Sequence, residues 1–146
     1  MKKLIYLLTV LTLFACHAQK ETSRQQKTRA TADCKTILPL NEEANPGQSD
    51  PYQLDSLAVN NHCLEVFVSY SGGCGEAEFD LYATNKVMQS MPPQAVLLLN
   101  FKDEDPCRAI VRDTLYFDLS NFNELAKSGG IWLHLKDSDK RVLYSF

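Results

Sequence analysis

Residues 63–83 read CLEVFVSYSGGCGEAEFDLYA, and this stretch decides the fold. On each side of a glycine-rich break, apolar residues recur at every second position. They are Leu64, Val66, Val68 and Tyr70 before the break, and Ala77, Phe79, Leu81 and Ala83 after it. Side chains of a β-strand alternate between its two faces, so this period of two indicates two half-buried strands. The three glycines within residues 72–75 allow a tight connection between them.

The same alternation continues on both sides of this stretch, and it predicts five further strands. The expected segments are residues 53–58, 95–102, 108–118, 131–136 and 141–146. Residues 120–127 are predicted to form one short helix, which Gly129 and Gly130 end. Short strands with turn residues at regular spacing predict an all-β fold, a seven-stranded antiparallel β-sandwich of the Ig-like type.

The first sixteen residues have the pattern of a secretory signal. Two lysines precede an apolar run over residues 4–14, which is too short for a transmembrane helix of about 20 residues. The run ends in Leu13-Phe14-Ala15-Cys16, which resembles the bacterial lipobox, although Phe14 is larger than the residue usual at its position. The resemblance implies that residues 1–15 are a lipoprotein signal peptide and that Cys16 carries acyl chains, palmitate among them.

A lipid anchor on Cys16 would hold the protein at the cell envelope. In the enterobacterial pattern an Asp after the cysteine retains lipoproteins at the inner membrane. This chain has His17 there, so we expect the outer membrane, with the domain facing either the periplasm or the cell surface. Two or more acyl chains anchor a protein stably, so the membrane is an expected partner through the anchor.

The sequence divides into an anchor region and one domain. Residues 16–51 are expected to hold the lipidated cysteine, a flexible tether and an irregular lead-in, and residues 52–146 the β-sandwich domain. Residues 17–33 contain no large apolar side chain and therefore have nothing to bury. A flexible chain of that length would span roughly 20–25 Å.

Charge and length limit the possible partners. Of 146 residues, 131 remain without residues 1–15, which suits one domain. Lys2 and Lys3 are removed with the signal peptide. The remaining chain has 13 of the 15 basic residues and all 18 acidic residues, so its net charge becomes −5. Nucleic-acid binding requires a clustered basic surface, so we expect no nucleic-acid partner.

Four cysteines remain beside Cys16, and an oxidising envelope favours disulfides between them. Cys63 and Cys74 lie at opposite ends of one expected strand, roughly 20 Å apart, whereas a disulfide needs Cα atoms within about 7 Å. If successive strands alternate in direction, the loops that hold Cys74 and Cys107 lie at the same end. We therefore expect the pairs Cys74–Cys107 and Cys34–Cys63, although a Greek-key crossing would invalidate the argument for the first pair.

The glycine-rich break carries a recognisable motif. Tyr70-Ser71-Gly72-Gly73-Cys74 is similar to a motif of small Bacteroidota lipoproteins, loosely the NigD-like group. The resemblance extends over residues 52–146 and implies no known activity. In that motif a histidine follows the cysteine by three positions, and this chain has Ala77 there, which weakens any metal site transferred from the resemblance.

Acidic residues near this motif are candidate ligands for calcium. They are Glu76, Glu78 and Asp80 on one strand face, and Asp103 and Asp105 in a later loop. Carboxylate oxygens suit Ca²⁺, but the spacing matches no recognised calcium loop, and a solvated strand face is the commoner explanation. Calcium binding is therefore an alternative, and no cofactor is expected.

Aromatic residues on the expected strands admit two interpretations. Trp132, Phe67, Tyr82 and Tyr116 could form a binding surface, or pack in the sandwich core as strand aromatics more often do.

No catalytic residue is predicted. A nucleophile needs a histidine within reach, and His62 lies at the far end of its strand from Cys74. A small envelope hydrolase would require His134, Ser71 and an acidic group in one cleft. The main prediction is a membrane-anchored envelope lipoprotein, not an enzyme, that acts as a binding or structural module for an envelope protein or a small ligand.

Overall fold

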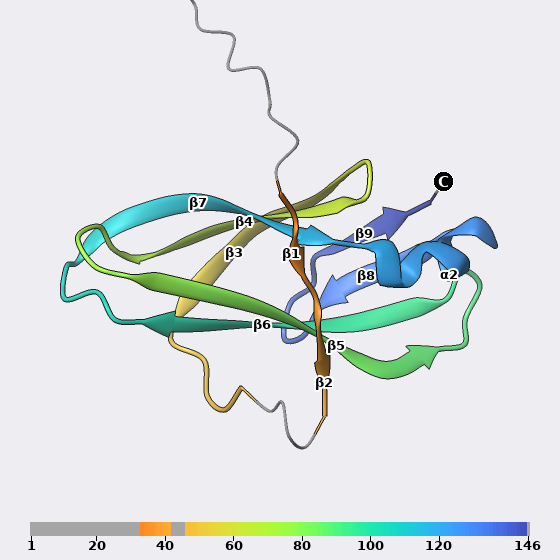
Figure 1. Ribbon diagram of the computed structural model, residues 1–146, viewed down its shortest axis with the longest axis horizontal. Helices are drawn as coiled ribbons and strands as arrows, with labels where there is room; N and C mark the ends of the chain where they lie inside the picture. Colours follow the sequence, from red (N-terminus) through yellow and green to blue (C-terminus); the bar gives the residue numbers. More distant parts are fainter. Residues whose placement is uncertain (1–32, 42–45, 146) are drawn as a thin grey trace, which may run out of the picture. The chain divides into compact units, whose positions relative to one another are not determined.

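The computed structural model describes residues 33–41 and 46–145, without the side chains of Asn85 and Lys86. The predicted signal peptide, Cys16 and the tether up to residue 32 lie outside these residues. Within them, nine strands follow one another along the chain (Figure 1). They are β1 (Lys35–Thr36), β2 (Leu38–Leu40), β3 (Tyr52–Asn60), β4 (Cys63–Gly72), β5 (Ala77–Met88), β6 (Gln94–Asp103), β7 (Ala109–Asp118), β8 (Ile131–Leu135) and β9 (Arg141–Tyr144).

The strands form two sheets, which confirms the predicted all-β class. The four-stranded sheet has the order β1-β7-β4-β3, and the five-stranded sheet has the order β2-β5-β6-β8-β9. Between β7 and β8 lie a 3-10 turn, η1 (Ser120–Phe122), and the short helix α2 (Asn123–Lys127). The architecture agrees with the predicted β-sandwich and its one short helix.

Alternate residues of both sheets build one hydrophobic core. Residues that are at most 2 % exposed come from β4 and β6 in particular: Leu64, Val66, Val68, Leu97, Leu99 and Phe101. Phe79 stacks on Phe101 with a centroid distance of 4.3 Å, and Tyr70 packs against both rings. Within the described part of the chain, no helix is long and apolar enough to cross a membrane.

The prediction of purely antiparallel sheets was wrong for three strand pairs. The pairs β1–β7, β2–β5 and β6–β8 are parallel. After β6 the chain passes through β7 in the other sheet and then through α2, so it re-enters the five-stranded sheet beside β6 in the same direction. Two adjacent strands can be parallel only when a crossover connection of this kind joins them.

The expectation of an irregular lead-in up to residue 51 was also wrong for residues 35–40. β1 pairs with β7 in one sheet, and β2 pairs with β5 in the other. Ile37 lies between the two short strands and is only 3 % exposed, because it enters the core where the chain crosses from one sheet to the other. The buried isoleucine, the pairing with two sheet edges and the Lys35–Asp80 ion pair all help to order this segment.

The sandwich has two ends, which we name by what they carry. We call residues 72–76 the glycine loop. At the glycine-loop end, this loop and residues 104–108 connect the sheets (Figure 1, left). At the Cys34 end lie the β3–β4 turn at residues 60–63 and the β5–β6 connection at residues 89–93. Strand direction places them there, because β4 runs from Cys63 to the glycine loop and β5 returns to Met88.

Candidate functional site

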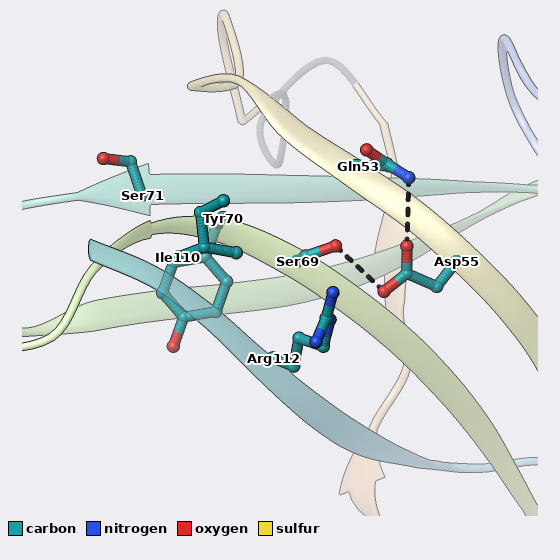
Figure 2. A pocket seen from close by; sticks show the side chains of 7 residues that line it. All are labelled: Gln53, Asp55, Ser69, Tyr70, Ser71, Ile110 and Arg112. Carbon is teal, nitrogen blue, oxygen red and sulfur yellow. Dashed lines mark hydrogen bonds between the residues drawn. The ribbon is translucent and has the colours of Figure 1, made fainter. Parts of the chain in front are cut away.

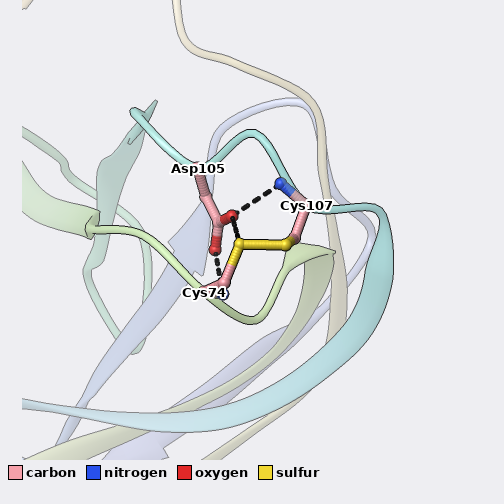
Figure 3. A group of neighbouring side chains, drawn as sticks. All are labelled: Cys74, Asp105 and Cys107. Atoms are coloured by element: carbon pink, nitrogen blue, oxygen red, sulfur yellow. Dashed lines mark hydrogen bonds between the residues drawn. A yellow bond between two sulfur atoms is a disulfide. The ribbon is translucent and has the colours of Figure 1, made fainter.

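Both disulfides favoured by the sequence are present in the structure. The Cα atoms are 6.0 Å apart in Cys34–Cys63 and 5.9 Å apart in Cys74–Cys107. The first bond joins the start of the described chain to the β3–β4 turn. The second bond joins the glycine loop to the loop after β6 (Figure 3).

The Asp105 carboxylate organises the glycine loop. Backbone N–H groups of Cys107, Gly75, Cys74 and Gly73 donate to it, and the distances are 2.8 Å from Cys107 and 2.9 Å from Cys74. These donors stabilise the ionised form and lower the pKa of Asp105 from 3.8 to about 2, although burial acts in the opposite direction. The Asp105 residue as a whole is only 6 % exposed.

The close approach of this carboxylate accounts for the glycines of the Tyr-Ser-Gly-Gly-Cys motif and for Gly75, which follows the motif. A Cβ atom on Gly72 would lie 2.9 Å from Asp105 Oδ2, and one on Gly75 would lie 2.7 Å from Asp105 Cα. Gly73 has a φ of +119°, which side chains rarely permit. The motif therefore builds a disulfide-linked loop around a buried acid, and its residues have a structural role.

Cys74, Asp105 and Cys107 lie close enough together to be a candidate metal site. The Sγ atoms of Cys74 and Cys107 lie within 4.8 Å of an Asp105 oxygen. Both sulfurs are in a disulfide and the carboxylate is occupied by backbone donors, so the group is a poor ligand set as it stands.

The acidic residues considered for calcium do not come together in the described part of the chain. Asp80 forms an ion pair with Lys35 at 2.7 Å, and Glu78 lies opposite Lys102 across β5 and β6. Asp103 accepts a hydrogen bond from the Asp105 N–H at 2.8 Å, and lies 4.0 Å from Arg108. Glu76 is exposed beside the glycine loop.

The residues of the hydrolase alternative lie on different sheets. Ser71 belongs to β4 of the four-stranded sheet, and its hydroxyl donates to the Cys107 carbonyl at 3.5 Å. His134 belongs to β8 of the five-stranded sheet, and its buried Nε2 has no hydrogen-bond partner among the described residues. The two side chains therefore do not form the nucleophile–base pair that such an enzyme requires.

The aromatic residues do not form a single binding surface, and Tyr82 alone among these four is buried, with an exposed fraction of 8 %. Phe67 and Tyr116 share the outer face of the four-stranded sheet with Glu65. Tyr82 and Trp132 lie on the outer face of the five-stranded sheet, because the residues beside them in sequence point into the core.

A polar groove lies on the outer face of the four-stranded sheet (Figure 2). Its volume is about 490 Å³, and its lining residues are Gln53, Asp55, Ser69, Tyr70, Ser71, Ile110 and Arg112. One row of the sheet forms its centre, because Gln53 lies opposite Ser69 and Ser69 lies opposite Arg112. A β-bulge at Leu54–Ser56 adds a residue to β3, which places Asp55 beside this row on the outer face.

The groove carries both signs of charge. The Asp55 carboxylate accepts hydrogen bonds from Ser69 Oγ at 2.9 Å and from Gln53 Nε2 at 3.2 Å. Arg112 extends toward this pair from β7 (Figure 2), yet its exposed guanidinium forms no ion pair or hydrogen bond within the described residues. A guanidinium has five N–H donors in a planar fork, which suits a carboxylate or phosphate of a ligand.

The sequence prediction missed this groove. The polar positions on the outer faces of β3, β4 and β7 were the available signal, but only the order β7-β4-β3 brings them into one row.

Comparison with known proteins adds information on the fold alone. No protein-family model matches the chain, and no curated protein matches it. A protein of unknown function, DUF1344, from Bacteroides vulgatus is similar in structure, with a TM-score of 0.56, 16% identity, and coverage of 77% of this chain and 56% of that chain. A NigD-like immunity protein from Bacteroides caccae has a TM-score of 0.53 and 14% identity, with coverage of 75% and 57%. The chain thus spans a little over half of the length of either protein.

Proposed function

We propose that this protein is a lipid-anchored lipoprotein of the bacterial outer membrane whose β-sandwich is a binding module. Its ligand site is the groove on the outer face of β3, β4 and β7, where Arg112 receives an acidic group. The observation that carries the proposal is the exposed guanidinium of Arg112, which has no partner within the described residues and faces fixed polar groups of β3 and β4. The likeness to a NigD-like immunity protein agrees with a binding role, but it concerns the fold alone.

The shape of the groove favours a protein partner. Small-molecule sites enclose most of their ligand in a concave pocket. This groove is open and lies on the face of a sheet, and Ile110 at its rim is 79 % exposed. An acidic segment of another envelope protein can lie along it with a carboxylate on Arg112 and an apolar side chain on Ile110.

Photocrosslinking in intact cells tests the binding site. A benzoylphenylalanine at position 110 is expected to capture a discrete partner, and Arg112→Glu is expected to abolish the product by reversing the charge. The matched control is benzoylphenylalanine at position 102, since Lys102 is exposed near the same end of the sandwich but on the other sheet. The proposed site would be overturned if the crosslinked product from position 110 persisted in Arg112→Glu. It would also be overturned if the protein with benzoylphenylalanine at position 110 and an intact Arg112 gave no crosslinked product.

The anchor is tested by labelling cells with radioactive palmitate. Wild-type protein is expected to incorporate label and to sediment with membranes, whereas Cys16→Ser should do neither. Label that persists in Cys16→Ser, or is absent from wild type, would reject lipidation at this residue.

A further inference from the structure

An apolar stripe crosses the outer face of the five-stranded sheet at its Cys34 end. Met88 lies opposite Gln94, Gln94 opposite Trp132, and Trp132 opposite Leu143, so one row runs through β5, β6, β8 and β9. Neighbouring strands are about 4.8 Å apart, so the row is about 14 Å long. We define the apolar stripe as Met88, Trp132 and Leu143 in this row, together with Met91 in the adjoining connection.

The stripe holds most of the large apolar side chains that the described surface leaves exposed. The exposed fraction is 45% for Met88, 39% for Leu143 and 101% for Met91, and the remaining member of that class, Ile110, lies in the groove. Arg141 places its guanidinium carbon 4.7 Å from the centre of the Trp132 ring. The stripe therefore combines flexible apolar side chains with an aromatic–cation pair, a combination suited to the boundary between lipid chains and headgroups.

The stripe lies at the end of the sandwich where the tether joins the domain. Cys34 is bonded to Cys63, and the neighbouring His62 has its Nδ1 3.1 Å from the hydroxyl of Tyr144. Tyr144 adjoins Leu143 in β9 and donates a hydrogen bond of 2.6 Å to Asn123. The Cys34–Cys63 disulfide and the His62–Tyr144 contact thus connect the first described residues to the strand that carries one edge of the stripe.

We propose that the apolar stripe docks on the surface of the bilayer that holds the lipid anchor. This inference rests on the proposed lipidation of Cys16. The 17 residues between Cys16 and Cys34 would keep the Cys34 end within roughly 20–25 Å of the membrane, and such tethering makes a weak contact effective. The groove lies on the opposite outer face, so docking turns it toward partners beyond the membrane.

The size of the stripe favours a lipid surface over a second copy of the chain. A stable protein interface buries about 800 Å² on each partner, far more than a row of three side chains and one neighbour supplies. The acidic net charge gives little attraction to anionic lipid, so insertion of the apolar side chains should drive contact with neutral phosphatidylcholine as well.

The single tryptophan of the chain makes the proposal directly measurable. Full-length lipidated protein is reconstituted in phosphatidylcholine vesicles with or without bromine on the acyl chains. We expect brominated lipid to quench Trp132 and neutral lipid to shift its emission to the blue. Met88→Ser with Leu143→Ser should remove most of the quenching without releasing the protein from the vesicles.

A relocated tryptophan provides the matched control. In the double variant Trp132→Phe, Phe67→Trp, the single tryptophan lies on the outer face of the four-stranded sheet, outside the groove lining. Brominated lipid should leave the emission of this tryptophan unchanged. Protein that floats with the vesicles while Trp132 is not quenched would overturn docking and leave the anchor intact. Protein that does not float would overturn both. A blue shift that grows with protein density but is insensitive to bromine would show a second copy on the stripe, and would also overturn the proposal.

Discussion

Gly75 and Asp105 are in direct backbone contact, since a Cβ atom on Gly75 would lie 2.7 Å from the Cα atom of Asp105. The contact holds the glycine loop against the loop that follows β6, and the Cys74–Cys107 disulfide closes the same junction. A neighbour that consists of backbone cannot move aside as the end of a flexible side chain can. A side chain at position 75 must therefore separate the two loops.

Gly75→Ala is expected to lower the free energy of unfolding by about 1–3 kcal/mol, the usual cost of forcing an extra group into occupied space. Urea unfolding followed by circular dichroism measures the change. Glu76→Ala is the control, because Glu76 is exposed and its substitution should change stability by no more than about 0.5 kcal/mol. Equal changes in the free energy of unfolding for the two substitutions would show that the close approach of Gly75 to Asp105 does not affect stability.

Asp105 should make stability depend on pH in the acidic range. Its pKa is 3.8 when unperturbed and about 2 in the folded protein, so folding favours the ionised form. The stabilisation is complete above pH 3.8 and is lost as the pH falls toward 2. Wild type should therefore lose stability over this range more steeply than Asp105→Asn, as measured by urea midpoints at successive pH values. Parallel pH profiles for the two proteins would contradict the assignment.

The Cys34–Cys63 disulfide should hold a segment that is otherwise weakly attached. β1 pairs with β7 through only two residues, and β2 with β5 through three. In the Cys34→Ser, Cys63→Ser variant, the amide hydrogens of residues 35–38 and 40 should exchange faster with solvent. Those of β4 and β7 should remain protected, because the ladder between these strands has ten residue pairs. The Cys74→Ser, Cys107→Ser variant is the comparison, and it should leave the exchange of residues 35–40 unchanged.

The sequence predicts the strands well because a period of two is a local signal. The turns at residues 60–63 and 72–76 also fix the relative ends of β3, β4 and β5, which is why both cysteine pairs could be derived. β1 and β2 carry no alternation, and Pro39 argues against a strand, so the burial of Ile37 and the pairing with β7 and β5 are needed to explain why they form. Such burial is a tertiary effect that a local pattern does not encode.

The groove was beyond prediction for a different reason. Ser69 and Arg112 are neighbours only because β7 pairs with β4 after β5 and β6 have entered the other sheet. Nothing in either segment specifies this long-range pairing. The position of Asp55 also depends on the bulge in β3, and no turn residue in the sequence indicates this bulge.

Calcium should not stabilise this protein. Asp80 is paired with Lys35, Asp105 is enclosed by backbone donors, and the acidic residues do not converge within the described chain. An ion that binds only the folded state raises the midpoint of thermal unfolding as its concentration increases. Melts with millimolar Ca²⁺ and with excess chelator should therefore coincide, whereas a midpoint that rises with the logarithm of the calcium concentration would establish a site.

Arg112 should be dispensable for folding, which distinguishes a ligand-binding arginine from a structural one. It is exposed and unpaired within the described residues, so Arg112→Gln should change the free energy of unfolding by no more than about 0.5 kcal/mol. The same variant should lose the photocrosslink at position 110, because glutamine keeps hydrogen-bonding atoms but removes the positive charge. Arg141→Gln is the matched control, since Arg141 is also exposed but stacks on Trp132 on the other sheet, and it should retain the crosslink. A large loss of stability in Arg112→Gln would mean that the guanidinium supports the fold, and the free charge on which the proposed site depends would not exist.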